Sequence, residues 1–416
     1  MMKRIAVIGG GASGLCAAIE ACRESQKLKF PVSVTVFERN TRVGKKLLLT
    51  GNGRCNLTNT SLDAGCYNTP RAVNVIRSLG GEDTRAFFEG LGIPTVVDAC
   101  GRVYPHSMQA SCVVNALRGE AERLGAGLRT DHKVDRLTRA GSHFLLDGAE
   151  TFDCTVIACG GCAYPSTGSD GDGARLLESM GIPCVPPIPS LTGLKVPDRD
   201  FKSLKGIRAK AEVCAFIDGK KAAAEHGEVQ FTEYGVSGIA VMQLSRPIAR
   251  ALNGGGNHRA EVVLDLAPDM EAEQLTGFLR TVCRRHRDML TAELLAGIVP
   301  RQLGFYLLKR CGIPIGENTC GNIPQDKIAQ ISAQIKALRL PISAVRGFEQ
   351  AQVTAGGADL RAFDERLMAR RVPGLFACGE VLDVDGMCGG YNLEWAFSSG
   401  RRCGKSAVDF LAEERE

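Results

Sequence analysis

Residues Ile5-Ala6-Val7-Ile8-Gly9-Gly10-Gly11-Ala12-Ser13-Gly14 are the most informative stretch of this chain. Four apolar residues, which predict a buried strand, lead directly into glycines spaced as G-x-G-x-x-G. The small and apolar side chains of residues 15–22 then predict a helix. In such a turn Gly9 permits the tight bend, Gly11 allows a ligand close to the backbone, and Gly14 lets the helix pack on the strand. A strand, a glycine turn and a helix in this order are typical of a dinucleotide-binding fold.

A second apolar and β-branched run, residues 32–37, ends at Glu38 and completes the pattern. A carboxylate at this position can accept hydrogen bonds from ribose hydroxyls, and it disfavours a 2′-phosphate. The helix N-terminus offers unpaired N–H groups and the positive end of the helix dipole to phosphates. This part of the chain therefore predicts a dinucleotide site, with a glycine-rich turn that binds no ligand as the alternative.

Length and composition are those of a globular protein of two or three domains: 416 residues, 44% of them hydrophobic, with a net charge of +5. The densest basic cluster, Arg284, Arg285 and Arg287, has no interleaved aromatic residue, so we expect a solvated helix face and no nucleic-acid partner. No apolar run is long enough for a membrane span, and no secretory apolar region can be drawn through the glycine turn. We therefore expect a cytoplasmic protein without a membrane partner, of undetermined oligomeric state.

The seventeen cysteines are an odd number, and most lie in apolar contexts, as Cys22, Cys154 and Cys378 do. In a reducing compartment such residues are core side chains more often than disulfides. Cys159 and Cys162 alone have the C-x-x-C spacing of a redox dithiol, but they follow a predicted strand instead of opening a helix, so thiolate activation is not evident. With one such pair and six scattered histidines, we expect no metal site.

Residues 43–56 carry three basic side chains and two asparagines, and they are too rich in glycine for a helix. A loop at the carboxyl end of a nucleotide-binding strand crosses the ligand crevice, so we expect this segment to contact the cofactor. Periodicity further predicts helices over 71–80, 83–91 and 111–124, an antiparallel set of strands within 128–146, a buried strand at 154–158, and a helix from near Ala174.

Alternating apolar and polar residues over 194–265 predict a β-rich part, in which Gly254-Gly255-Gly256 is expected to form a hairpin turn. Residues 271–286, 301–310 and 325–338 have helical periodicity and are separated by prolines. The spacing of Gly168, Gly171 and Gly173 before a helix either binds an anion or simply opens that helix.

Residues 374–404 again show the pattern of the first domain, a buried strand followed by a glycine turn and a helix. A buried strand at 374–378 ends in Gly379-Glu380, and a helix begins near Asn392. Beside the first strand, this arrangement would place a carboxylate near the middle of an extended ligand and a helix N-terminus beyond it. Reduction of a flavin builds negative charge at N1 and O2, which a helix dipole favours. A second site so far downstream suits FAD, whereas a nicotinamide coenzyme has no need of it.

These motifs resemble those of two-dinucleotide-binding-fold flavoproteins of the glutathione-reductase type. More narrowly, the chain is similar to the BaiN-like family of bacterial NAD(P)/FAD-dependent oxidoreductases, also labelled the aminoacetone-oxidase family. The most specific strings are Arg-Cys-Asn-Leu-Thr-Asn at residues 54–59 and Gly-Gly-Tyr-Asn at 389–392. Further matching segments are residues 7–14, 50–53, 164–168, 353–357 and 379–383. Cys159 stands where the family usually has threonine.

The resemblance implies an α/β fold in which residues 1–192 and 345–416, from both chain ends, form a Rossmann-like FAD-binding domain. A β-barrel-like domain, residues 193–268 with part of 339–355, interrupts it and carries a helical insert, residues 269–340, which we expect to act as a lid. The FAD contacts that we expect are Gly9, Gly11, Ala12, Gly14, Glu38, Arg39, Lys46, Gly53, Arg54, Asn56, Val134, Gly160, Gly379, Glu380, Gly390, Asn392 and Leu393.

No second G-x-G-x-x-G follows a strand, so the sequence predicts no separate NAD(P)H domain. NAD(P)H would then visit the flavin as a transient donor, or an organic substrate would supply electrons that leave to oxygen or a quinone. The family defines no catalytic acid or base, and our candidate proton donors are Tyr391, Tyr164 and Cys388. Arg54 could anchor an acidic substrate or contact a phosphate.

The leading hypothesis is hydride transfer at flavin N5, in an NAD(P)H-linked reduction of an activated C=C bond of a hydrophobic or steroid-like small molecule. One alternative is an amine or aminoketone oxidase that passes electrons to oxygen. Another is a flavin-binding protein that modifies RNA.

Overall fold

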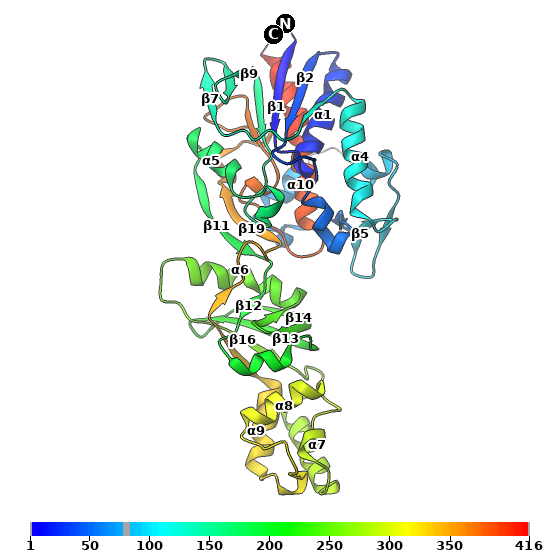
Figure 1. Ribbon diagram of the computed structural model, residues 1–416, viewed down its shortest axis with the longest axis vertical. Helices are drawn as coiled ribbons and strands as arrows, with labels where there is room; N and C mark the ends of the chain where they lie inside the picture. Colours follow the sequence, from blue (N-terminus) through cyan, green and yellow to red (C-terminus); the bar gives the residue numbers. More distant parts are fainter. Residues whose placement is uncertain (1, 78–83, 415–416) are drawn as a thin grey trace. The chain divides into compact units, whose positions relative to one another are not determined.

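A five-stranded parallel sheet takes its strands from both ends of the chain (Figure 1). In spatial order they are β20 (Leu375–Ala377), β10 (Cys154–Ile157), β1 (Lys3–Ile8), β2 (Val32–Phe37) and β6 (Gly127–Arg129). The computed structural model describes residues 2–77 and 84–414 and divides into two units, Met1–Ile188 with Gln352–Glu416, and Pro189–Ala351. The predicted Rossmann-like architecture, formed by both chain ends, is confirmed.

Helices α1 (Ala12–Leu28) and α10 (Tyr391–Glu413) pack against each other at very short range. A Cβ atom on Gly400 would lie 2.2 Å from the carbonyl oxygen of Ser13, and one on Gly404 would lie 2.1 Å from that of Ala17. The two backbones therefore touch, and no larger side chain could occupy these positions. This contact holds the N-terminal part of α1 against the middle of α10.

Shorter helices complete the first unit. The helices predicted over 71–80 and 83–91 are α2 (Arg71–Arg77) and α3 (Thr84–Gly90), and residues 78–83 between them lie outside the described part of the chain. The other two predicted helices of this unit are α4 (Ala110–Arg123) and α5 (Asp172–Ser179).

Further strands lie outside the parallel sheet and before or after the seven-stranded sheet described below. They are β3 (Thr58–Asn59), β4 (Thr95–Val97), β5 (Arg102–Pro105), β7 (Leu137–Ala140), β8 (His143–Leu146), β9 (Glu150–Phe152), β11 (Cys184–Ser190) and β19 (Val353–Ala358). The prediction of one antiparallel set within 128–146 is wrong in its bounds, because β6 pairs in parallel with β2, while β7, β8 and β9 form the antiparallel set. Residue spacing alone does not reveal which partner a three-residue strand takes.

The second unit is built on a seven-stranded antiparallel sheet. Its spatial order is β17 (Leu338–Ile342), β16 (Ala260–Asp265), β13 (Arg208–Ile217), β14 (Lys220–Thr232), β15 (Gly235–Ser237), β12 (Leu194–Lys195) and β18 (Ala344–Val345). Ser343 alone separates β17 from β18, although these strands form opposite edges of the sheet. The sheet must therefore curl round on itself, as the barrel-like expectation requires.

The part predicted as β-rich, residues 194–265, also contains a helix, α6 (Ile239–Asn253), which was not predicted. Val241, Leu244 and Ile248 are buried at helical spacing, but Pro247 inside the helix made this pattern easy to miss. Residues 254–256 consequently join α6 to β16, and the prediction of a hairpin turn there is wrong.

Three helices lie between β16 and β17: α7 (Ala272–Arg285), α8 (Arg301–Arg310) and α9 (Gln325–Lys336). They match the three helices predicted from periodicity, and their apolar faces belong to the core of the second unit. Among the described residues, no helix combines the length and apolar character that crossing a bilayer demands.

Candidate functional site

The glycine turn after β1 has the geometry that its spacing predicts. Gly9 has a φ of 111°, and a Cβ atom there would lie 2.4 Å from the carbonyl oxygen of Ala158. A Cβ atom on Gly14 would lie 1.8 Å from the carbonyl oxygen of Gly9, so the helix could not approach the strand with any side chain present. Gly11 differs, because a Cβ atom there would have no other atom within 4 Å. The space beside Gly11 is therefore open to a ligand.

Glu38 lies at the carboxyl end of β2 with only 8% of its surface exposed. Its Oε2 accepts a hydrogen bond from the Gly10 N–H at 3.0 Å, and its Oε1 accepts from the N–H and side-chain amide of Asn40 at 2.8 and 2.6 Å. These contacts hold the carboxylate against the glycine turn. Because each carboxylate oxygen has two acceptor sites, Oε2 can still accept a ligand hydroxyl.

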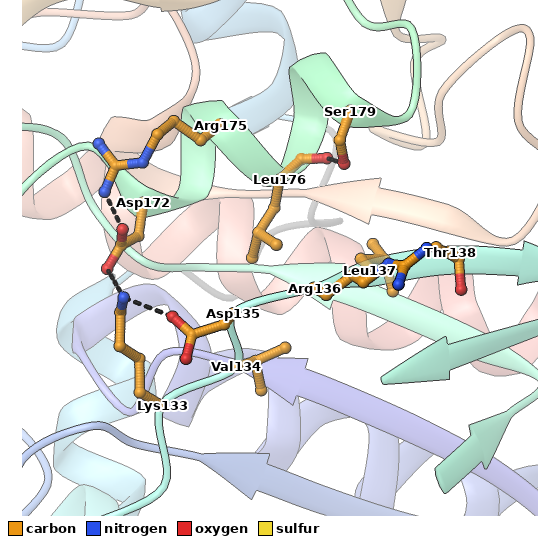
Figure 2. A pocket seen from close by; sticks show the side chains of 10 residues that line it. All are labelled: Lys133, Val134, Asp135, Arg136, Leu137, Thr138, Asp172, Arg175, Leu176 and Ser179. Atoms are coloured by element: carbon orange, nitrogen blue, oxygen red, sulfur yellow. Dashed lines mark hydrogen bonds and ion pairs between the residues drawn. The ribbon is translucent and has the colours of Figure 1, made fainter. Parts of the chain in front are cut away.

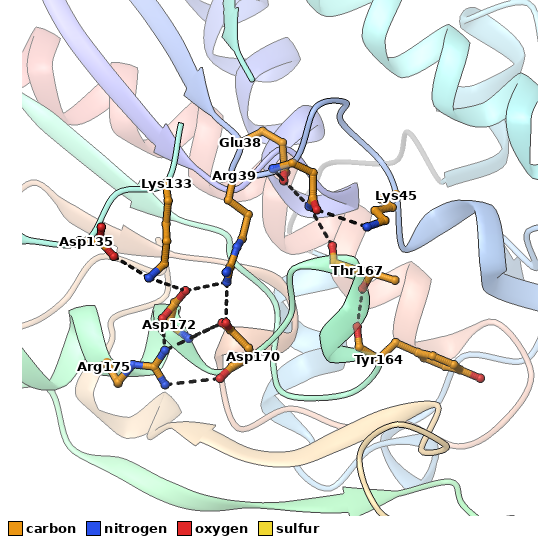
Figure 3. A network of polar contacts seen from close by, with 11 residues as sticks. Glu38, Arg39, Lys45, Lys133, Asp135, Tyr164, Thr167, Asp170, Asp172 and Arg175 are labelled. Atoms are coloured by element: carbon orange, nitrogen blue, oxygen red, sulfur yellow. Dashed lines mark hydrogen bonds and ion pairs between the residues drawn. The ribbon is translucent and has the colours of Figure 1, made fainter. Parts of the chain in front are cut away.

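Arg39 belongs to a network of alternating charges (Figure 3). Its guanidinium lies 2.6 Å from Asp170 and 2.8 Å from Asp172, and Asp172 also pairs with Lys133 and Arg175. The predicted cofactor residue Arg39 is thus already neutralised by two carboxylates. Asp172 is the first residue of α5, and Asp170 lies two residues before it. Gly171, between the two acids, is the N-cap of that helix.

Val134 lines a cavity of about 480 Å³ between the segment that leads into β7 and helix α5 (Figure 2). Leu137 and Leu176 also line this cavity, and the ion pairs of Lys133 and Arg175 with Asp172 lie at one end of it. The segment before it is tied to the nucleotide strand, because the His132 N–H donates to the Glu38 carbonyl oxygen at 2.9 Å.

Lys46 and Glu380 bring the two distant motifs together. The Lys46 Nζ lies 2.5 Å from Glu380 Oε2, and the Thr354 N–H donates to Glu380 Oε1 at 2.7 Å. The Thr354 hydroxyl in turn accepts from the N–H groups of Cys162 and Ala163 at 2.8 and 3.0 Å. Thr354 lay in a motif of the sequence, but nothing there predicted that its hydroxyl would hold the loop after β10.

Gly160 and Gly379 lie within the same arrangement. Both have positive φ, and a Cβ on Gly160 would lie 2.5 Å from the Ser169 hydroxyl, whereas one on Gly379 would lie 2.5 Å from that of Ser13. The Gly379 N–H donates to the Ser399 hydroxyl at 2.9 Å, and its carbonyl accepts from Trp395 Nε1 at 3.0 Å. Side chains of helix α10 therefore hold this turn in place.

Close contacts and side-chain hydrogen bonds hold the start of α10 and the loop before it. Gly390 is its N-cap at φ 104°, where a Cβ would lie 2.3 Å from the Thr58 carbonyl oxygen. The Asn392 side chain accepts from the Gly386 N–H at 2.8 Å and donates to the Gly386 carbonyl at 3.0 Å. Asn59 donates to the Gly389 carbonyl at 3.0 Å. The loop before the helix is thus fixed by side chains from both motifs.

Two features of this arrangement fit a bound FAD. Helices α1 and α10 begin at Gly11 and Gly390 without a side-chain cap, so their first N–H groups remain for a ligand. Asn56 Oδ1, near Gly390, is buried without a hydrogen-bond partner among the described residues. Donors beside one buried acceptor suit the imide edge of a flavin, where an N–H lies between two carbonyl groups.

Arg54 and the remaining expected contacts make few bonds of their own. The Arg54 guanidinium lies over the Tyr104 ring at 5.5 Å and donates to the Gly51 carbonyl at 3.2 Å. Gly53 has a φ of 81°, in keeping with its place in a strained turn. Ala12 and Leu393 lie in the first turns of α1 and α10.

The three candidate proton donors have different surroundings. Burial and Cys66 raise the pKa of Tyr391 to about 12, so this hydroxyl keeps its proton at neutral pH. Burial also raises the pKa of Cys388. The half-buried Tyr164 points its hydroxyl away from the charge network of Figure 3, and no partner for that hydroxyl is found among the described residues.

The thiols of Cys159 and Cys162 are both disfavoured as thiolates. Burial and the neighbouring Glu38 raise the pKa of Cys159 to about 12, and burial with Glu380 raises that of Cys162. None of the seventeen cysteines forms a disulfide bond in the structure. In the described residues, no group of three or more His, Cys, Asp or Glu side chains is placed to hold a metal ion.

Known proteins similar to this chain include enzymes of two named activities. The family model described as HI0933-like protein Rossmann domain matches residues 3–406, which confirms the family resemblance. The chain is 39% identical to a 3-dehydro-bile acid delta(4,6)-reductase of Clostridium scindens, over 98% of this chain and 100% of that relative. It is 28% identical to a ribosomal RNA dihydrouridine synthase of Haemophilus influenzae, over 96% and 97% of the two chains. The solved structure of a flavocytochrome c3 fumarate reductase matches with a TM-score of 0.45 and 14% identity, over 98% of this chain and 78% of the other.

Proposed function

The chain belongs to the HI0933-like Rossmann-domain family and is an FAD-dependent oxidoreductase, and we propose that it reduces a carbon–carbon double bond conjugated to a carbonyl group. The names of both kinds of relative support this reaction. A 3-oxo steroid with a Δ4 double bond and a uracil ring each hold a C=C bond next to a carbonyl, and each relative is named for saturating such a bond. The reaction class is common to both, although their substrates differ greatly in size and charge.

The site residues have distinct roles in this proposal. The N–H groups at the start of α1 and the open face of Gly11 bind the pyrophosphate, and Glu38 accepts the ribose hydroxyls. Lys46, Glu380 and Gly160 line the middle of the cofactor, and Gly390, Asn392 and Asn56 hold its flavin end. Arg39 and Val134 flank the adenine end. When bound, FAD supplies hydride transfer at its N5 atom.

The substrate receives a hydride at the carbon remote from its carbonyl and a proton at the carbon beside the carbonyl. Tyr164 is our first candidate for the proton, because its hydroxyl is uncommitted among the described residues, whereas Tyr391 is buried and burial raises the pKa of Cys388. NAD(P)H replaces the hydride in each turnover, as a visiting donor. The helical insert, 269–340, is the part that we assign to substrate enclosure.

An anaerobic titration tests this proposal. Purified protein reconstituted with FAD is treated first with NADH and then with NADPH, and a 3-oxo-Δ4 steroid is added after the flavin has bleached. We expect bleaching by one nucleotide and return of the flavin absorbance with one saturated product per flavin. A flavin that neither nucleotide bleaches, but that an amine or aminoketone reduces and that forms hydrogen peroxide once oxygen is admitted, would instead indicate the amine or aminoketone oxidase.

A second candidate substrate is RNA, and an observation on α7 favours it. Arg280, Arg284 and Arg285 lie in the C-terminal half of this helix and Arg287 lies just beyond it. All four are exposed, and none has an acidic partner among the described residues. Phe278, on the same helix, is 48% exposed. Arg285 follows Phe278 by seven residues, which puts its guanidinium on the same face of the helix as this ring. Exposed cationic groups together with an exposed aromatic ring suit a nucleic-acid strand. This observation goes against the expectation of no nucleic-acid partner.

Binding measured against salt distinguishes the two substrates. If RNA is the substrate, a uridine-rich RNA binds with an affinity that falls steeply as salt rises, and Arg280→Ala with Arg284→Ala reduces that slope by about two. Glu293→Ala with Arg301→Ala, an ion pair of the same insert, is the matched control. An affinity without salt dependence would leave the small-molecule substrate as the proposal.

A further inference from the structure

Glu394 is a buried carboxylate that the proposed reaction does not use. Only 2% of this residue is exposed. Its Oε1 accepts a hydrogen bond from the Ser398 hydroxyl at 2.6 Å, whereas its Oε2 is buried and has no hydrogen-bond partner among the described residues. A carboxylate in this state is unfavourable for folding, because it loses its hydration and gains one donor in return.

The position of Glu394 puts this charge close to the start of α10. It lies four residues after the N-cap Gly390, which is roughly 6 Å along the helix axis. Side chains of a helix lean toward its N-terminus, so the carboxylate lies over the first turn.

The interactions of Tyr67 also place the Glu394 carboxylate near the start of α10. Its hydroxyl donates to the carbonyl of Tyr391, the first residue of the helix, at 2.9 Å. Burial, together with the charge of Glu394, raises the pKa of Tyr67. The carboxylate and the first turn of α10 are therefore close enough to interact electrostatically.

A negative charge at this place opposes the positive end of the helix dipole. The N-terminal N–H groups of α10 favour an anion, and reduction of a flavin creates one at its pyrimidine edge. We propose that the Glu394 carboxylate weakens this preference, so that the site binds reduced flavin less tightly, relative to oxidised flavin, than the helix alone would. The bound flavin is then a stronger reductant, which suits an enzyme that donates hydride to a C=C bond.

This inference rests on the proposed placement of the flavin end at α10 but not on the identity of the substrate. The test is therefore the reduction potential of the bound FAD, measured without substrate against a reference dye at one pH. Glu394→Gln keeps the shape and an acceptor for Ser398 but removes the charge. We expect it to raise the affinity for reduced over oxidised flavin about tenfold, which for a two-electron couple is a shift of about 30 mV to a more positive potential.

Two companion variants separate charge from structure. Glu394→Asp retains the charge and should keep the affinity ratio within about twofold of wild type. Glu413→Gln makes the same change at the far end of the same helix, where Glu413 pairs with Arg366, and should also leave the ratio unchanged. Affinity for oxidised FAD should stay within about twofold of wild type in all three, because oxidised flavin carries no charge at this edge.

An unchanged potential in Glu394→Gln would overturn the proposal, and so would an equal shift in Glu394→Asp. If Glu394→Gln fails to fold, Ser398→Ala takes its place, since it removes the hydroxyl that stabilises the charge. A positive shift in that variant supports the proposal, and no shift contradicts it. Failure of the wild-type protein to bind FAD would instead contradict the flavin site itself.

Discussion

Lys46 and Glu380 form an ion pair across 334 residues of sequence, with 2.5 Å between Nζ and Oε2. The pair links the loop after β2 to the turn after β20, and Thr354 and Gly161 donate backbone N–H groups to the same carboxylate. The two ends of the chain therefore meet in one polar arrangement, where the proposed cofactor crosses the carboxyl edge of the parallel sheet.

Lys46→Met should weaken FAD binding about tenfold, because removing one partner of a half-buried ion pair leaves the other charge without its cation. The measurement is a fluorescence titration of the apoprotein with FAD. Lys27→Met removes a lysine that pairs with Glu24 on α1, and it should leave FAD affinity unchanged. Equal affinities in both variants would show that the Lys46–Glu380 pair is not part of the cofactor site.

Gly11→Ala should mainly lower the affinity for FAD, whereas Gly14→Ala should mainly lower the stability of the fold. The space beside Gly11 is open, so its variant should fold with wild-type stability but bind FAD far less tightly. Gly14→Ala places a Cβ against the Gly9 carbonyl and should cost about 3 kcal/mol or more of stability.

Gly119→Ala is the control for both glycine variants. Gly119 lies in α4, and a Cβ atom there would have nothing within 4 Å, so alanine should be neutral or stabilise the helix by about 0.5–1 kcal/mol. Thermal melts with and without FAD measure all three variants. Normal FAD affinity in Gly11→Ala would contradict the close approach of the cofactor to this backbone.

Residue patterns within a single segment were enough to predict several elements of the fold. The glycine turn, Glu38, the three helices between β16 and β17 and the helix after Gly390 all follow from spacing within one segment, and the structure has them close to the predicted bounds. The helix α6 was missed because Pro247 interrupts its pattern, and the partner of β6 was missed because three residues do not specify one.

Contacts between segments that are far apart in the sequence could not be predicted from residue spacing. Glu380 was predicted as a site residue, but its partner Thr354 was known only as part of a motif. Glu394 and Tyr67 were not singled out at all, since one acid in a helix and one tyrosine in a loop are ordinary until folding buries them together. Burial and pairing of polar groups are properties of the packed chain, and residue spacing does not contain them.

The C-x-x-C pair should behave as two ordinary, partly buried thiols. Because the pKa of Cys159 is raised to about 12, this residue stays a neutral thiol at pH 8 and ionises only as the pH rises far above that value. Iodoacetamide at pH 8 should modify the exposed Cys100 and spare Cys159, as read by peptide mass spectrometry. Cys159→Ser should retain the reductase activity within about twofold. A loss of activity comparable to that of a flavin-site variant would instead support a redox role for Cys159 and Cys162.

Replacing residues 270–336 by a short Gly-Ser linker should leave FAD bound. Every expected flavin contact lies in the first unit, and β16 and β17 pair with Leu264 opposite Leu338, so a short linker can close the gap. The yellow colour and flavin absorbance should persist while reduction of the substrate is lost, if the insert encloses the substrate. Loss of the flavin would contradict the assignment of the insert as a lid.

The reoxidation of reduced enzyme by a conjugated ketone tests the central claim most directly. The FAD-loaded protein is reduced under anaerobic conditions and mixed with a 3-oxo-Δ4 steroid or, separately, with uridine-containing RNA, while the flavin absorbance is recorded. We predict that one of these substrates restores the oxidised spectrum and yields one saturated C–C bond per flavin. A flavin that stays reduced with both, and is reoxidised only when oxygen enters, would contradict the account.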